Sequence, residues 1–375
     1  MSCLRSLSLR WSAAFAVSSS LVFSSLSFAA AADDLGAQRD AAIAKTVEFL
    51  AKQQTPEGAF SPQTGAAVTA LVTAGLLKSG RSADDPVVAK ALKYLQTFVQ
   101  PDGGIYAPES NYKNYETGLA LMAFVDANKD GRYTELLKGS EKFVRGLQWD
   151  ESEGKDISDP TYGGAGYGKS ARPDLSNTSF FLDALKATGA GPEDEAIKKA
   201  LIFVSRCQNL ETEHNTTEFS AKNPDGGFYY TPAAGGSSQA GKTDAGGLRS
   251  YASMTYAGLK SMIYAGVGPN DPRVKAALEW IKMNYSLKEN PGMGTAGLFY
   301  YYHTFAKALD AMGQETFNDA AGQPHEWRKE LLVVLLDSQK PDGSWTNENA
   351  RWMEGDANLV SGYALLTLAY LKPAK

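Results

Sequence analysis

The chain has 375 residues, of which 43% are hydrophobic and 21% charged, a composition that excludes an intrinsically disordered protein. The formal net charge of -5 lacks the basic surplus that nucleic-acid binders usually carry, so we expect no nucleic-acid partner. Two cysteines, Cys3 and Cys207, exclude a disulfide framework and a cysteine-rich zinc site. A large apolar core must therefore hold the fold together.

Residues 1–32 have the layout of a secretory signal peptide. Arg5 and Arg10 precede an uncharged, serine-rich apolar stretch, and Ala29–Ala32 offers small residues for cleavage. A membrane anchor is the alternative, but the stretch is short and diluted by serine for a bilayer span. We expect a mature chain of residues 33–375 with one cysteine and no integral membrane segment. Such a chain suits secretion or a bacterial periplasm.

A short turn motif recurs along the mature chain. Four segments carry it, the last of them loosely: Gln100–Tyr106, Asn223–Tyr229, Gln339–Trp345 and Gln54–Phe60. In its Pro-Asp-Gly core, proline presets φ and glycine accepts positive φ. The motif therefore predicts a positive φ at Gly103, Gly226 and Gly343.

Two kinds of helical segment alternate around these turns. Six amphipathic segments have apolar residues at helical spacing, namely Ile43–Leu50, Val88–Val99, Leu136–Leu147, Ile197–Val204, Val274–Ile281 and Trp327–Leu336. Six segments are apolar on all sides, which is typical of buried helices, namely Ala66–Leu77, Tyr115–Val125, Asn177–Leu185, Tyr251–Tyr264, Tyr301–Met312 and Leu359–Leu371. The pattern predicts an all-α fold of six helical hairpins that close into one α6/α6 toroid over residues 33–375. An open solenoid is the alternative, although the terminal hairpins lack the distinct character of caps.

Two insertions break the regularity, at residues 150–175 and 209–248. Loops of this length are usually functional or mobile. They belong to the third and fourth hairpins, so they could share one rim of the toroid. Alternatively, the two insertions are flexible surface loops without a shared site.

The repeated Gln-x-Pro-Asp-Gly-Gly/Ser-aromatic pattern resembles the repeats of protein prenyltransferase β subunits and the QW repeats of squalene and hopene cyclases. The resemblance covers nearly all of residues 38–372. It implies a terpenoid cyclase-like α/α toroid with an aromatic-lined cavity, which in relatives holds an isoprenoid. Any enzymatic activity would then be cyclase-like or prenyltransferase-like.

The catalytic constellations of those relatives are missing from the sequence. The cyclases protonate an alkene with an Asp-x-Asp-Asp motif, and Asp84-Asp85 lacks its first aspartate. The prenyltransferases bind zinc through an Asp-x-Cys pair and a histidine. His303 matches that histidine, but the matching region around Tyr251 has no Asp-x-Cys. We therefore expect neither a metal nor another cofactor.

Residues 126–133 match the first half of a calcium-binding loop. Position 12 of such a loop should be a bidentate acid and is Leu137 here. The sequence leaves open whether this segment binds calcium or is an Asx-rich turn between helices.

Polar residues at the starts of the inner segments form the candidate site. His303, Tyr251 and Glu116 are candidate catalytic residues, since a histidine near neutrality can act as an acid or a base. A hydrogen-bonded core histidine is the alternative for His303. Candidate ligand-binding residues are Tyr300, Thr304, Lys307 and Asn177.

The segment that carries His303 has two faces at helical spacing. Its apolar stripe consists of Tyr301, Phe305, Ala308 and Met312 and is expected to pack on outer helices. The opposite, more polar face would then look into the central cavity. It consists of Tyr300, His303, Thr304 and Lys307.

The sequence thus predicts a secreted toroid whose cavity binds or transforms an isoprenoid-like or other apolar small molecule. Whether chemistry occurs there stays open. A non-catalytic scaffold for an unknown protein partner is one alternative. A polysaccharide-processing toroid is another, and it would need convergent acids. The inner segments carry few of them, namely Glu116, Asp183 and Asp310.

Overall fold

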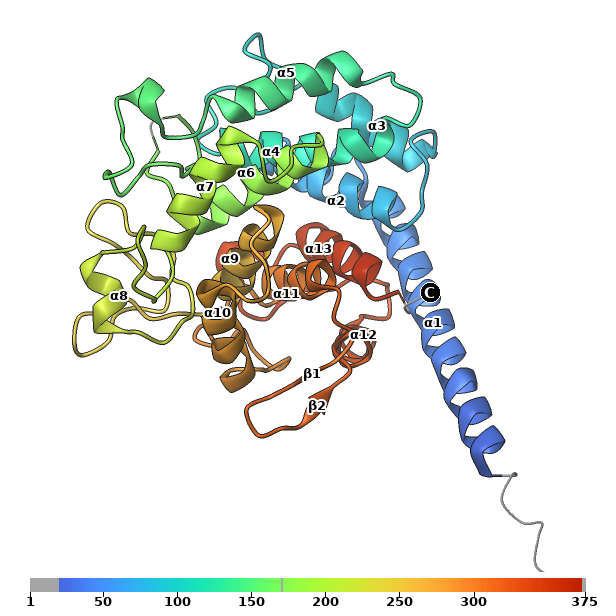
Figure 1. Ribbon diagram of the computed structural model, residues 1–375. Coiled ribbons are helices and arrows are strands. Elements are labelled where there is room, and N and C mark those ends of the chain that lie inside the picture. The colour runs from blue at the N-terminus through green and yellow to red at the C-terminus, as the bar shows by residue number, and fades with distance from the viewer. Residues whose placement is uncertain (1–19, 170, 373–375) are drawn as a thin grey trace, which may run out of the picture.

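The computed structural model describes residues 20–169 and 171–372, and these residues fold into two concentric layers of helices (Figure 1). The inner helices are α2 (Ala67–Lys78), α4 (Lys113–Ala127), α6 (Leu175–Ala187), α9 (Ala252–Tyr264), α11 (Leu298–Met312) and α13 (Ala357–Tyr370). The outer helices are α1 (Ser20–Gln53), α3 (Pro86–Gln96), α5 (Thr134–Arg145), α7 (Glu195–Arg206), α10 (Pro272–Met283) and α12 (Trp327–Ser338). Short elements complete the described chain: η1 (Pro62–Thr64), η2 (Glu151–Glu153), α8 (Glu218–Lys222), β1 (Phe317–Asn318), β2 (Pro324–His325) and η3 (Arg351–Met353). The two strands pair antiparallel, with Phe317 opposite His325.

The inner helices form a closed ring. Each contacts the next in the order α2, α4, α6, α9, α11 and α13, and α13 returns to α2. The first outer helix, α1, contacts both α12 and α13, so the outer layer closes as well. The prediction of an all-α, α6/α6 toroid is therefore confirmed, and an open solenoid is wrong.

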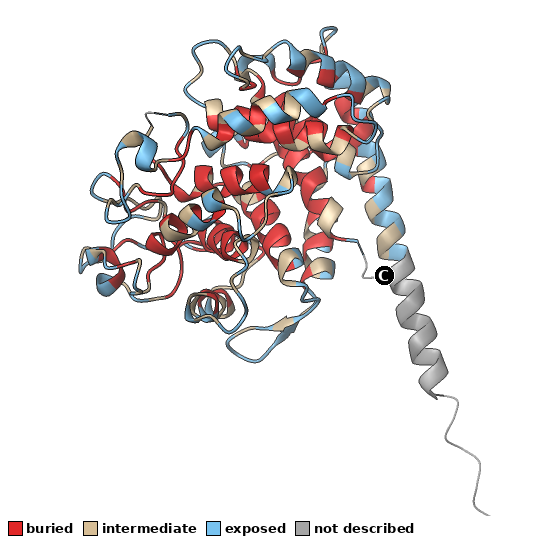
Figure 2. Cartoon of the chain, turned by 45° about the horizontal axis from the view of Figure 1, so that its top comes forward, coloured by how far each residue is buried: buried red, intermediate tan, exposed pale blue. Residues whose placement is uncertain are grey.

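Burial explains why the two layers differ in sequence. In α3, the buried residues are Val88, Ala91, Leu92 and Leu95, a single stripe at helical spacing. In α2, every residue of 68–76 is buried, because this helix has neighbours on all sides. Figure 2 shows the same contrast, with buried inner helices and exposed outward faces on the outer ones. Each fully buried leucine contributes roughly 2 kcal/mol through the hydrophobic effect.

A glutamine after each of four outer helices joins that helix to the next one. Its side-chain amide donates to the carbonyl of the turn glycine and to a carbonyl of the following outer helix. The glutamines are Gln54, Gln148, Gln208 and Gln339. In the last case the acceptor is Ala42 O in α1, 2.9 Å away, so this bond closes the ring.

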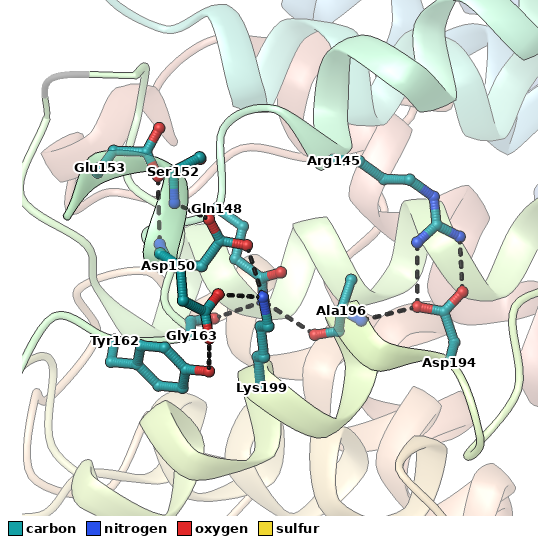
Figure 3. Close-up of polar contacts among 11 residues, drawn as sticks. Arg145, Gln148, Asp150, Ser152, Glu153, Tyr162, Gly163, Asp194, Ala196 and Lys199 are labelled. Carbon is teal, nitrogen blue, oxygen red and sulfur yellow. Dashed lines mark hydrogen bonds and ion pairs between the residues drawn. The ribbon is translucent and has the colours of Figure 1, made fainter. Parts of the chain in front are cut away.

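Figure 3 shows the joint between α5 and α7. Gln148 Nε2 lies 2.9 Å from Gly163 O and 2.8 Å from Ala196 O. Beside it, the Arg145 guanidinium donates two hydrogen bonds to the Asp194 carboxylate, at 3.0 and 2.8 Å. Asp194 also caps α7, so one carboxylate both starts the helix and binds it to its neighbour.

The turn glycines have the predicted backbone conformation. The φ angles of Gly103, Gly226 and Gly343 are +89°, +79° and +90°. Each glycine also lies against a carbonyl group of the next outer helix, where a side chain would not fit. A Cβ atom on Gly343 would lie 2.5 Å from the carbonyl oxygen of Lys45 in α1.

The predicted signal peptide falls largely outside the described residues, which begin at Ser20 with α1. Within the described part of the chain, the structure contains no helix that is both long and apolar enough to cross a membrane. Cleavage after residue 32 and export of the chain stay predictions.

Candidate functional site

A cavity of about 680 Å³ lies at the end of the ring where the inner helices begin. Every inner helix contributes to it from its first two turns, through Val68, Glu116, Asn177, Ser253, Tyr300 and Leu359 among others. The volume falls in the range of roughly 300–1,000 Å³ that small-molecule sites occupy. The positive ends of six helix dipoles also meet around this space.

The rim of the cavity is built from loops. Tyr167 comes from the first insertion, and Tyr230 and Gln239 come from the second. The prediction that the two insertions share one rim is therefore right. Trp352 of η3 completes the rim with a 46% exposed side chain and a φ of +55°.

Nine aromatic residues line the cavity: Tyr112, Tyr115, Tyr167, Phe180, Tyr230, Tyr251, Tyr300, Trp352 and Tyr363. Phe180 lies at the centre of the group, with its ring 4.9 Å from that of Tyr115 and 6.2 Å from that of Tyr300. The hydroxyl groups of Tyr115 and Tyr363 bind each other at 2.9 Å, and those of Tyr300 and Ser176 at 3.1 Å. Because the hydroxyl groups pair among themselves, the ring faces remain for an apolar or cationic ligand.

Glu116 lies in the cavity wall at the start of α4. Its carboxylate accepts hydrogen bonds from the backbone N–H groups of Ala107 and Ala66, at 2.9 and 3.2 Å, and from the Ser110 hydroxyl. These bonds hold two loops against α4. The carboxylate therefore shapes the wall as well as bringing a charge to it.

Glu354 has the same arrangement at the start of α11. Its carboxylate accepts from the backbone N–H groups of Phe299 and Tyr300, at 3.0 and 2.9 Å, and from Asn347 Nδ2 at 2.7 Å. Burial raises the pKa of Glu354 above its usual range. Sequence patterns did not indicate this residue, because it lies in a loop without periodicity.

Asp174 is a second acid that the sequence reasoning missed. Its carboxylate caps α6, accepting from the backbone N–H and the side-chain amide of Asn177 at 2.8 Å each. The side chain is fully buried behind the cavity wall, and burial raises its pKa to about 6. An aspartate three residues before an asparagine at a helix start is a capping signal that was available in the sequence.

The structure divides the predicted site residues into two groups. Glu116, Asn177, Tyr251 and Tyr300 line the cavity. His303, Thr304 and Lys307 are buried within the ring and are not among the lining residues.

His303 points toward the inner helix α13. Its ring lies 6.0 Å from that of Tyr363 and 6.2 Å from that of Tyr370. Burial lowers the pKa of His303 to about 3, so the imidazole is neutral. Its Nδ1 atom has no hydrogen-bond partner among the described residues. On the opposite face of α11, Phe305 packs on Trp327 of the outer helix α12, as the apolar stripe predicted.

Lys307 belongs to a buried ionic cluster. Its Nζ atom lies 2.9 Å from Asp183, and Lys260 Nζ lies 2.6 Å from the same carboxylate. Burial alone would raise the pKa of Asp183, but the two lysines lower it below the usual range. Burial also lowers the pKa of Lys260 to about 8. The cluster joins α6, α9 and α11 inside the ring.

Thr304, the remaining predicted ligand-binding residue, donates its hydroxyl to the backbone carbonyls of Tyr301 and Tyr300, at 3.0 and 3.2 Å. Its side chain is thus engaged within α11.

Among the described residues, no group of three or more His, Cys, Asp and Glu side chains is placed to hold a metal ion. In the half calcium loop, Asp126 pairs with Lys78 at 2.8 Å, and Arg132 binds Asp130. Asn128 accepts from the backbone N–H of Tyr133 at 2.7 Å, which is an Asx-type turn contact.

Comparison with known proteins identifies the fold. No protein-family profile and no curated protein matches the chain. Among solved structures, a variant of the type II terpene cyclase MstE from Scytonema, in complex with geranylgeranyl dihydroxybenzoate, aligns with a TM-score of 0.54 and 14% identity. The alignment covers 90% of this chain and 97% of that one. A family 76 glycoside hydrolase from a bovine Bacteroides thetaiotaomicron strain aligns with a TM-score of 0.53 and 12% identity, over 88% of this chain and 77% of that one. The chain therefore has the α/α toroid fold of the type II terpene cyclase MstE, which this family 76 glycoside hydrolase shares.

Proposed function

We propose that this protein binds an isoprenoid-like, largely apolar small molecule in the cavity at the end of the ring where the inner helices begin. The wall of aromatic rings around Phe180 carries the proposal, since it offers apolar faces in an enclosed space of about 680 Å³. The toroid of MstE, which shares the fold, was solved with a geranylgeranyl compound. That likeness supports the class of ligand proposed here.

The acids around the cavity favour binding over acid-initiated cyclisation. Protonation of an alkene requires an unusually strong carboxylic acid. Burial instead raises the pKa values of Asp174 and Glu354, which makes both groups weaker acids than usual. A third acid, Glu116, already accepts three hydrogen bonds that fix it in the wall. The fourth, Glu109, is exposed. The proposal is therefore one of ligand binding.

Titration calorimetry with farnesol tests the proposal. The wild-type chain should bind farnesol, and Val68→Trp, which places an indole ring in the cavity, should weaken binding. Phe180→Ala should weaken it, because the ring at the centre of the wall is lost. Tyr94→Ala is the matched control, since it removes an aromatic ring of the outer helix α3 that contacts Phe98 edge to face, away from the cavity. Equal farnesol affinity in wild type and Val68→Trp, with both chains folded, would refute the proposal.

A second candidate function is glycan hydrolysis. Three carboxylates, Glu109, Glu116 and Glu354, line one cavity, and glycosidases generally use a pair of such groups. The exposed ring of Trp352 at the rim offers a surface on which a sugar can stack. Release of reducing ends from a panel of polysaccharides, lost in both Glu116→Gln and Glu354→Gln, would favour this candidate over lipid binding.

A further inference from the structure

Two arginine side chains stack on aromatic rings at the rim of the cavity. The guanidinium of Arg351 lies 4.2 Å from the ring centre of Trp352, and that of Arg172 lies 5.7 Å from the ring centre of Tyr230. Both of these rings line the cavity, whereas the two arginines lie outside its lining, against the rings. Stacking on an aromatic face holds a guanidinium in place while its edge stays free to bind a partner.

The two arginines reach the same loop from different parts of the chain. Arg172 Nη1 donates to the Ser237 hydroxyl at 3.3 Å, and Arg351 Nη2 donates to Gln239 Oε1 at 2.7 Å. Gln239 itself lines the cavity. Residues 237–239 thus connect the two guanidinium groups at the rim, and both acceptors are neutral.

Most arginines of the described chain are paired differently. Six of them form an ion pair with a carboxylate: Arg39, Arg81, Arg132, Arg145, Arg273 and Arg328. Arg206 is engaged by three backbone carbonyls, and Arg249 donates to the carbonyl of Lys242. Arg172 and Arg351 differ from all of these, because they combine contact with the cavity wall and the absence of a carboxylate partner within the described residues.

Their hydrogen-bonding capacity is largely unused. A guanidinium has five N–H donors, and among the described residues each of these two donates one hydrogen bond. Both side chains are exposed. The three acids that line the cavity do not serve as partners. Glu116 and Glu354 are bound to backbone N–H groups, and the exposed Glu109 forms no ion pair with either arginine among the described residues. The positive charge of Arg172 favours the ionised form of Asp174, but the Asp174 carboxylate is fully buried at the start of α6 and forms no ion pair with Arg172.

We infer that the ligand of this cavity has an anionic head, a carboxylate or a phosphate, which Arg172 and Arg351 bind at the rim while the apolar tail lies among the aromatic rings. The inference rests on the proposed function, because it assigns the second half of the same ligand. Guanidinium groups match both anions in geometry and bind them through charge-assisted hydrogen bonds. The positive ends of the inner helices around the cavity add to the attraction.

Three probes that share one tail test the inference: farnesol, farnesoic acid and farnesyl monophosphate. The wild-type chain should bind at least one of the two anions about tenfold more tightly than farnesol, and the preferred anion identifies the head group. Arg172→Gln and Arg351→Gln should each remove most of that preference and leave the affinity for farnesol within about twofold.

Arg249→Gln is the matched control. It removes an exposed arginine of the second insertion that has no carboxylate partner among the described residues. Unlike Arg172 and Arg351, it does not stack on a described ring that lines the cavity. Its affinities should equal those of the wild type. An equal loss of anion affinity in all three variants would mean that net charge, rather than contact, is responsible, and would overturn the inference.

The failures of the two proposals differ. If none of the three probes binds, the proposed function fails and the inference fails with it. If farnesol binds, the anions bind no more tightly, and the arginine variants change nothing, the inference alone is wrong. Circular dichroism of each variant should match that of the wild type, since both arginines are exposed at the rim.

Discussion

The joint between the last turn and the first outer helix makes a quantitative prediction for Gly343→Ala. Gly343 has a φ of +90°, and an added Cβ would lie 2.5 Å from the carbonyl oxygen of Lys45. The substitution therefore introduces two unfavourable effects, a strained backbone and a steric clash across the joint between the first and last hairpins.

The two effects are separable with Gly80→Ala. Gly80 has a φ of +97°, but no heavy atom lies within 4 Å of the position of its Cβ. A residue with a Cβ in a left-handed conformation costs about 1–2 kcal/mol, so Gly80→Ala should lower the free energy of unfolding by that amount. A clash in a packed region adds about 1–3 kcal/mol, so Gly343→Ala should lower the free energy of unfolding by about 2–5 kcal/mol.

Equilibrium urea unfolding, followed by far-ultraviolet circular dichroism, measures both variants against the wild type. Gly343→Ala should unfold at a clearly lower urea concentration than Gly80→Ala. Equal midpoints for the two variants would refute the reasoning, because they would mean that the last turn does not approach α1 closely and that the ring is not closed by this contact.

Three further predictions follow from the buried acids and the N-terminus. Asp183→Asn leaves two buried lysines without their carboxylate and should destabilise the chain by about 3–5 kcal/mol in the same assay, whereas Asp310→Asn on the exposed end of α11 should change it little. The folded-state pKa of Asp174, about 6, lies above its usual 3.8. The folded state thus binds the extra proton between about pH 4 and 6, so wild-type stability should fall over this range as pH rises, by about 3 kcal/mol relative to Asp174→Asn, which keeps a capping side chain. A pH profile parallel to that of the variant would contradict the assignment. Exported protein should begin near Asp33 by N-terminal sequencing, and an intact Met1 in the exported fraction would show that no signal is removed.

The helical layers could be predicted from the sequence because burial in this fold repeats along the chain. One-sided burial gives the outer segments an apolar stripe, and burial on all sides gives the inner segments their uniform composition. The same periodicity indicated which face of α11 looks inward. The periodicity does not indicate how far the cavity extends along the helix. His303 lies about 4.5 Å further along α11 than the cavity-lining Tyr300, at a rise of 1.5 Å per residue.

The ionic cluster was missed for a related reason. Asp183 was recognised as an inner acid, but its partners lie on other helices at a large separation in sequence. The positions of the three residues relative to the ends of their helices would have indicated that they lie at the same level of the ring. Asp183 and Lys260 each stand four residues before the last residue of α6 and α9, and Lys307 stands five before the end of α11. Glu354 and the rim arginines lie in irregular loops, where no period relates sequence to position.

The contacts between Gln339 and Ala42, and between Gly343 and Thr46, join residues that are 297 positions apart in the chain. Loop closure over this distance adds only about 1.5 kcal/mol to that of a 50-residue hairpin, since each doubling of length adds about 0.6 kcal/mol. Closing the ring therefore costs little additional free energy. The contact between the first and last hairpins can, however, form only after the rest of the chain has been synthesised. During synthesis the N-terminal outer helix lacks its partners α12 and α13 until the C-terminal hairpin has been made. Its apolar stripe would stay uncovered for most of translation, which is a state that chaperones recognise and that delays completion of the fold until the whole chain is available.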